Sequence, residues 1–369
     1  MPLVWPQKNR SIAMETLSRA GHENIVLKYE QIFKDRAAVI PVYVSSKGNV
    51  NYEFSAFLYC TWLYFGKLKS MKTISTYAEC LSDWFNYLEL IDVDWRSCKV
   101  REIAAYRNWL CGTEYASEKR KKLAGRTINL RLTAVSEFYK SYWKKVGCAG
   151  NEKDLVESIG RLVVRVNKKR PKIIPTEKIG VMRRNMNHVH GLIFFWCLCT
   201  GLRIGSVLSL TERDFRQLVS SQSKFLSVKV KGGKLLEVYV PLRVIEETEK
   251  YIRLERAIRQ LDRPWDRVDQ LFLNSNARPV TRQGYYKAFK SAAYKAGVEC
   301  SPHSTRATYA SKLVERITPV CQESGLDSMK VVQTLLGHVS VETTQDYVDS
   351  ISICSTNVLE AIEESLNDF

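Results

Sequence analysis

The most specific fragment of the sequence is Pro302-His303-Ser304-Thr305-Arg306. His303 and Arg306 are three positions apart, so on a helix they lie on one face and can contact the same phosphate. The chain has only five histidines among its 369 residues, which makes a chance His-x-x-Arg pair uncommon. We therefore take this fragment as one part of a candidate anion site and look for the other parts along the chain.

A histidine and a tyrosine follow the fragment at a fixed spacing. The segment 331–337 has the apolar spacing of an amphipathic helix that ends at a glycine C-cap, and His338 comes directly after it. Ser340 is placed to cap the next helix, which would carry Tyr347 about two turns in. A tyrosine has an ordinary pKa of about 10, so a nucleophilic tyrosine needs neighbours that stabilise its phenolate or accept its proton. Tyr347 is one of 18 tyrosines, and in isolation a packing role would be the simpler interpretation.

An arginine stands upstream, after the apolar run 192–196, which predicts a buried helix. Gly201 can turn the chain at the end of that helix, and Arg203 begins the next apolar segment. A guanidinium held by packed structure can bind a phosphate in a fixed orientation. Taken alone, Arg203 would also be an ordinary surface arginine.

Two β-rich runs, 225–230 and 235–241, flank Lys231-Gly232-Gly233-Lys234 and predict a β-hairpin. A lysine at a hairpin tip can reach a neighbouring cleft and donate a proton to a leaving oxygen. A solvated turn would also carry lysines. The spacing alone does not choose between Lys231 and Lys234.

Composition favours a polyanionic partner. The 56 Lys and Arg residues minus the 39 Asp and Glu residues give a formal charge of +17, more than solubility requires. The ten cysteines form no Cys-x-x-Cys pair and have no zinc-site spacing with histidine, so we expect reduced thiols and no bound metal or cofactor. The amino terminus has no signal-peptide core, and the apolar run 191–199 is far shorter than the ~20 residues that span a bilayer. We expect a soluble, cytoplasmic protein that has no contact with a membrane.

The chain divides into segments of different pattern. Apolar stripes at helical spacing predict helices between residues 54 and 147, with Thr73 or Ser75 capping one and Thr127 capping another. The basic, proline-containing stretch that begins at residue 165 predicts a linker. We therefore expect a mainly α protein with a small β-sheet, built as a two-domain clamp. Its parts are an N-terminal extension (1–49), a helical DNA-binding domain (50–164), a linker (165–175) and a mixed α/β domain (176–369).

In this order, and with their flanking residues, the candidate site residues resemble the catalytic signature of the tyrosine recombinase (integrase) family. They are Arg203, Lys231, His303, Arg306, His338 and Tyr347. The resemblance covers residues 176–369, and the helical region 50–150 is similar to the family's core-binding domain in a less specific way. The resemblance favours Lys231 over Lys234, because the family's lysine usually precedes the glycine pair.

The resemblance implies site-specific strand exchange in double-stranded DNA without metal or cofactor. Tyr347 would attack a phosphodiester and form a 3′-phosphotyrosyl link. Arg203, Arg306 and His338 would contact the phosphate, His303 would assist proton transfer, and Lys231 would protonate the leaving 5′ oxygen. Enzymes of this kind act as a homotetramer on two DNA sites, with accessory proteins in some systems and often for a mobile genetic element.

Two positions depart from the family pattern. Ser206 stands where an acidic residue is usual, and Ala307 stands where histidine is common. Both indicate a divergent subfamily whose site is supported differently. Three alternatives stay open at this stage: a type IB topoisomerase-like enzyme, a telomere-resolving enzyme, and a non-catalytic DNA-binding protein on an integrase fold.

The carboxyl-terminal segment Asn357 to Phe369 predicts a short helix. Asn357 and Glu360 have the spacing of a capping box, and an apolar stripe follows. Such a helix can fold back on its own domain. The family resemblance implies instead that it docks into a neighbouring protomer.

Overall fold

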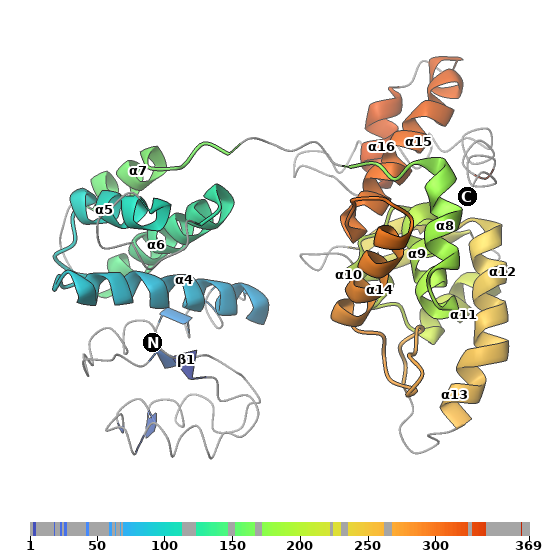
Figure 1. Cartoon of the computed structure of the whole chain (residues 1–369), viewed down its shortest axis with the longest axis horizontal. Helices are drawn as coiled ribbons and strands as arrows, with labels where there is room; N and C mark the ends of the chain where they lie inside the picture. Colours follow the sequence, from blue (N-terminus) through green and yellow to red (C-terminus); the bar gives the residue numbers. More distant parts are fainter. Residues whose placement is uncertain are drawn as a thin grey trace. The chain divides into compact units, whose positions relative to one another are not determined.

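A computed structural model describes residues 69–112, 123–146, 152–166, 172–221, 224–229, 235–261, 268–323 and 327–336, together with a few single positions such as Glu363. The chain divides into two compact units, Met1–Lys168 and Lys169–Phe369, which are drawn in Figure 1. The division falls inside the segment 165–175, for which the sequence predicts a linker. That one unit binds DNA and the other carries catalysis stays a prediction.

The first unit is helical where it is described. Its helices include α4 (Met71–Leu90), α5 (Val100–Cys111), α6 (Gly125–Val146) and α7 (Glu152–Arg161). The apolar stripes predicted from the sequence form its core, since Trp84 and Phe85 of α4 and Phe138 and Tyr139 of α6 are fully buried. Their rings meet edge to face, as between Phe85 and Phe138. The first unit also holds a short antiparallel pair, β1 (Leu3–Val4) with β2 (Val42–Tyr43).

A polar bridge joins three of these helices. The Asp83 carboxylate on α4 accepts a hydrogen bond of 2.9 Å from the Tyr106 hydroxyl on α5 and pairs with Arg131 on α6. All three groups are shielded in part from water, so the bridge orients the helices more than an exposed ion pair would.

Two predicted helix caps are wrong. The N-cap of α4 is Ser70, whose hydroxyl accepts from the backbone N–H of Thr73. Thr127 lies inside α6, which begins at Gly125. Several hydroxyl residues stand near the start of α4, and its cap is the one that still has an extended backbone, Ser70 with ψ of 147°.

Where it is described, the second unit is also mainly helical and contains a two-stranded sheet, as predicted. Its elements are α8 (Thr176–Arg184), α9 (His188–Thr200), α10 (Ile204–Val207), α11 (Glu212–Ser220), β3 (Phe225–Lys229), β4 (Leu235–Tyr239), α12 (Leu242–Tyr251), the π-helical turn η2 (Ile252–Arg256), α13 (Ala257–Leu261), α14 (Arg282–Lys295), α15 (Pro302–Glu323) and α16 (Ser328–Leu335).

Helix α9 is the centre of this unit. It has apolar residues on every side, and nearly all of them are buried. The buried indole of Trp196 donates a 2.9 Å hydrogen bond to the Thr248 hydroxyl of α12. Helices α8, α12, α14 and α15 all pack against α9. This arrangement confirms the predicted buried helix and fixes the position of Gly201 at its end.

The predicted hairpin is confirmed in its strands. β3 and β4 pair antiparallel, with Phe225 opposite Tyr239 and Lys229 opposite Leu235. Inward residues such as Leu226 and Val238 are buried, whereas Ser227 and Glu237 face outward. The turn, with Lys231 and Lys234, lies outside the described residues.

Glu363 of the carboxyl-terminal segment contacts its own unit in this single chain. Its carboxylate Oε1 accepts from Lys224 Nζ at 2.8 Å, from the Tyr239 hydroxyl at 2.7 Å and from the backbone N–H of Leu242 at 3.3 Å. The donors thus lie at the open end of the hairpin and at the first residue of α12. The contact is the fold-back arrangement that the sequence left open beside docking into a neighbour.

Candidate active site

Helix α15 carries the His-x-x-Arg fragment at its first turn. Pro302 is the first residue of the helix, a place where its missing N–H costs nothing. His303 is exposed to solvent, whereas Arg306, one turn further, is only 4% exposed. The helix therefore presents one titratable ring to the outside and buries one guanidinium beneath it.

The Arg306 guanidinium joins three segments of the chain. Its Nη1 donates to the carbonyl of Gly201 at 2.8 Å, and its Nη2 donates to the carbonyl of Leu336 at 2.5 Å. Gly201 ends α9, two residues before Arg203, and Leu336 follows α16, two residues before His338. The buried arginine thus sets the position of two stretches that lead to other candidate site residues.

Gly201 is required at the end of α9 for two reasons. Its φ of +64° lies in the left-handed region, which favours glycine. A Cβ atom there would stand 2.5 Å from Tyr309 Cδ1 and 2.7 Å from Leu336 Cδ2. The backbone of α9 therefore approaches α15 and the end of α16 more closely than a larger residue allows.

Arg203 is the N-terminal cap residue of α10 and is exposed. Within the described part of the chain its side chain has no carboxylate partner. Burial and, second, the positive charge of Arg203 lower the pKa of Arg306 to about 10, while Tyr309 acts in the opposite direction. Two guanidinium groups this close without an anion between them repel each other, so a bound anion at this place is stabilised.

Ser206, which replaces the usual acidic residue, lies in α10. Its backbone carbonyl accepts a 2.8 Å hydrogen bond from the Ser209 hydroxyl. Next to it, the Arg282 guanidinium lies directly against Gly205, since a Cβ there would be 2.2 Å from Arg282 Nη2. Arg282, the first residue of α14, adds a further positive charge beside α10. Sequence reasoning missed it because nothing in the local pattern places α14 next to α10.

The structure brings Arg203, His303 and Arg306 together in one unit, and it leaves the other candidates untested. Lys231, Lys234, His338 and Tyr347 lie outside the described residues. Their described neighbours are the strand ends Lys229 and Leu235 and, for His338, the buried Leu336.

A small polar cleft of about 290 Å³ opens beside His303. It is lined by Lys172, Lys290, Glu299, Cys300, Ser301, His303 and Ser304. The two lysines come from the start of the second unit and from α14. Sequence reasoning missed both, because lysines are common on helix surfaces and only the fold shows that these two face the His303 loop.

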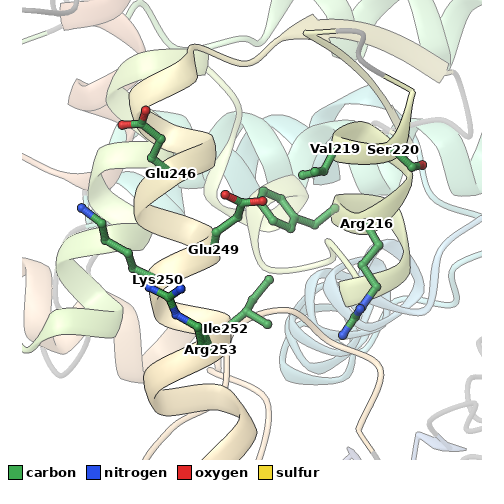
Figure 2. Close-up of a pocket in the computed structure, with 9 residues that line it drawn as sticks. Arg216, Val219, Ser220, Glu246, Glu249, Lys250, Ile252 and Arg253 are labelled. Atoms are coloured by element: carbon green, nitrogen blue, oxygen red, sulfur yellow. The ribbon is translucent and has the colours of Figure 1, made fainter.

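A larger groove, about 940 Å³, lies elsewhere in the second unit, between α11 and the α12–η2 helix. Figure 2 shows Arg216, Val219 and Ser220 on one wall and Glu246, Glu249, Lys250 and Arg253 on the other. Arg203, His303 and Arg306, the candidate residues that the structure describes, do not line it. The larger volume of this groove is therefore no reason to place the reaction there.

The part of the chain that the structure describes shows neither a metal cluster nor a membrane span. No three histidine, cysteine or acidic side chains in that part of the chain are grouped to hold a metal ion. No helix there has the length and apolar character to cross a membrane.

A sequence profile of the phage integrase family matches residues 181–352, the stretch that contains the candidate residues. This stretch is therefore similar in sequence to the tyrosine recombinases, the class to which the following relatives belong. The tyrosine recombinase XerD of Listeria monocytogenes is 37% identical over 152 residues, which cover 40% of this chain and 46% of that relative. The chain thus spans about half the length of such relatives. XerD of Rickettsia bellii is 25% identical over 75% of this chain and 88% of its own length.

Solved structures share the fold of this chain. A lambda integrase dimer bound to a COC′ core site aligns with a TM-score of 0.55 at 15% identity, over 78% of this chain and 94% of that one. A lambda integrase tetramer bound to a Holliday junction aligns with a TM-score of 0.54 at 16% identity, over 92% of this chain and 90% of that one. At such identities the likeness concerns the fold, and it confirms the predicted fold class, mainly helical with a small β-sheet.

Proposed function

We propose that the chain is a site-specific DNA strand-transferase in which Tyr347 is the nucleophile. The observation that supports this most is the arginine pair. Besides its burial, the charge of Arg203 lowers the pKa of Arg306, which places the two side chains near each other, and Arg306 donates to the segment that leads to His338. A paired cationic site without a described carboxylate suits a phosphodiester.

The reaction would proceed by transesterification. The Tyr347 oxygen forms a bond to phosphorus, the phenol loses its proton to a base, and the bond from phosphorus to the 5′ oxygen breaks. Arg203 and Arg306 offset the charge that grows on the phosphoryl oxygens, where a fixed donor contributes about 3 kcal/mol. His303 serves as proton carrier, His338 as a further phosphate contact, and Lys231 as the donor to the leaving 5′ oxygen. A 5′-hydroxyl of a second strand then reverses the step.

The partner is double-stranded DNA that carries a recombination site. The lambda integrase tetramer that shares the fold is bound to a Holliday junction. By that analogy we propose a homotetramer on two DNA sites, in the cytoplasm, acting for a mobile genetic element and with or without accessory proteins. The net charge of +17 suits such a complex.

The test is a covalent adduct. The protein is incubated without divalent metal with nicked suicide duplexes that carry inverted repeats from beside its gene, and adducts are resolved by denaturing electrophoresis. We expect an adduct that Tyr347→Phe abolishes. Tyr294→Phe is the control, since Tyr294 is 87% exposed and lies outside the site.

Three outcomes would count against the proposal. An adduct that survives in Tyr347→Phe removes Tyr347 as nucleophile. Relaxation of a supercoiled plasmid without any exchange between two sites would indicate a topoisomerase-like enzyme, while DNA binding without adduct would indicate a non-catalytic protein.

A further inference from the structure

The polar cleft beside His303 has a surplus of positive charge. Lys172 and Lys290 face it, and Glu299 supplies the carboxylate among the residues that line it. Lys172 Nζ already pairs with Glu299 at 2.5 Å. Among the residues that line the cleft, the ammonium of Lys290 therefore remains without a compensating negative charge.

Lys290 is held in place by a backbone group. Its Nζ donates a 2.9 Å hydrogen bond to the carbonyl of Cys300, and no carboxylate pairs with it within the described part of the chain. Burial raises the pKa of the Cys300 thiol, and the nearby charges of Lys290 and then Lys172 oppose that effect. Both ammonium groups thus lie close to the loop that leads into α15. An ammonium has three donors, so the bond to Cys300 leaves two for a ligand.

The loop itself is well defined. The Ser301 backbone N–H donates to the Ser304 hydroxyl at 3.2 Å, and the Ser304 N–H donates to the Ser301 carbonyl at 2.8 Å. These bonds fix the start of α15 and with it the place of His303. Lys290, Ser301 and His303 therefore line the same cleft.

We propose that this cleft binds a DNA backbone phosphate that neighbours the cleaved phosphate, with the Lys290 ammonium as its ion-pair partner. The inference rests on the proposed function, because it places the cleaved phosphate at the neighbouring His303 and arginine pair. Lys290 then acts as a positioning residue. It joins the DNA backbone to the Cys300 carbonyl and so to the loop that carries His303.

The experiment measures how DNA affinity depends on salt. Full-length protein binds a fluorescent duplex of random sequence, and anisotropy gives the affinity at several salt concentrations. Each lost phosphate contact makes the slope of log K against log salt less steep by about 0.9. For Lys290→Met we expect that change. Between roughly 0.05 and 0.2 M salt, the wild type should lose about 3.5-fold more affinity than the variant.

Two control variants make the result specific. Lys290→Arg keeps the charge and should keep the wild-type slope. Lys295→Met removes a lysine of the same helix that is exposed and does not line the cleft, so it should also keep the slope. A merely structural role of Lys290 would lower affinity at every salt concentration without changing the slope.

The outcomes separate the inference from the function it rests on. Equal slopes for the wild type and Lys290→Met, or an equal loss in Lys295→Met, overturn it. In a second arm, inorganic phosphate replaces the duplex and thermal unfolding is followed. If phosphate stabilises the wild type but not Lys290→Met, while the two proteins have equal salt slopes for DNA, the cleft is a site for free anions. That result overturns the DNA assignment. A full Lys290 effect on the slope without any Tyr347 adduct keeps the subsite and removes the proposed reaction.

Discussion

Replacing Gly201 by alanine should disrupt the site from its centre. The residue has a φ of +64°, and alanine pays about 1 kcal/mol to adopt it. The added Cβ would also stand 2.5 Å from Tyr309 and 2.7 Å from Leu336, both buried and unable to turn away freely. Overpacking of this kind costs about 1–3 kcal/mol. The sum is a loss of about 2–4 kcal/mol.

Gly297 provides a matched control. It also has a positive φ, +70°, but an added Cβ would meet nothing within 4 Å. Gly297→Ala should therefore lose about 1 kcal/mol, from the backbone alone. The difference between the two variants isolates the packing of α9 against α15 and the end of α16.

The assay is urea unfolding of the full chain, with hydrogen exchange read by mass spectrometry to localise the change. We expect Gly201→Ala to speed exchange in peptides from α9 and α15, and Gly297→Ala to leave them protected. Because Leu336 also accepts a hydrogen bond from Arg306, the adduct yield should fall with stability. If Gly201→Ala is as stable as Gly297→Ala, the close approach of these helices does not stabilise the unit and the reasoning is refuted.

Three further substitutions test single contacts. Burial alone would raise the pKa of Glu363, but the hydrogen bonds from Lys224 and Tyr239 outweigh burial and lower it. The contact therefore stabilises the fold fully at a pH above the ordinary pKa of 4.5, and this stabilisation is lost as the pH falls through the lowered pKa of the folded state. Glu363→Gln should lower the free energy of unfolding in urea by about 1–2 kcal/mol near pH 7. If the difference between wild type and variant did not shrink in acid, the contact would not be its cause. Thr308→Val leaves the buried N–H of Ile174 without its 2.8 Å acceptor and should cost about 1–3 kcal/mol, with faster exchange at the Ile174 amide; an unchanged amide would contradict this. Gly160→Ala, in a helix and with nothing within 4 Å, should raise stability by about 0.5 kcal/mol, and a lower Tm would show a contact not foreseen.

The parts of the fold that depend on local pattern were predictable. The hairpin follows from two β-rich runs around a Gly-Gly pair, and α9 follows from an apolar run that ends at Gly201. These signals involve neighbours in sequence, so the chain states them directly. The predicted cap of α4 was wrong although it too depends on neighbours in sequence. Ser70, Thr73 and Ser75 are chemically alike, and only the backbone conformation decides which of them caps the helix.

The support of the site could not be predicted. Arg306 binds carbonyls of residues 105 and 30 positions away, and any residue has a carbonyl to offer. Likewise, Arg282 lies against Gly205 across a sequence distance that no periodicity encodes. Side-chain chemistry marked Arg203, His303 and Arg306 as candidates, whereas tertiary packing chose their partners.

The two arginines of the site differ in how much order they would gain on binding a phosphate. Arg306 is buried and already held by two carbonyls, so three of its five N–H donors remain and little side-chain entropy is left to lose. Arg203 is exposed and, among the described residues, has no carboxylate to hold it, so it must be ordered when the phosphate arrives. Ordering such a side chain costs about 0.5–1.5 kcal/mol. An exposed acidic neighbour would reduce that cost, and the chain has Ser206 at the usual position of one. In the proposed reaction Arg306 would therefore offer the phosphate a pre-oriented contact besides stabilising the fold, while Arg203 would contribute through binding alone.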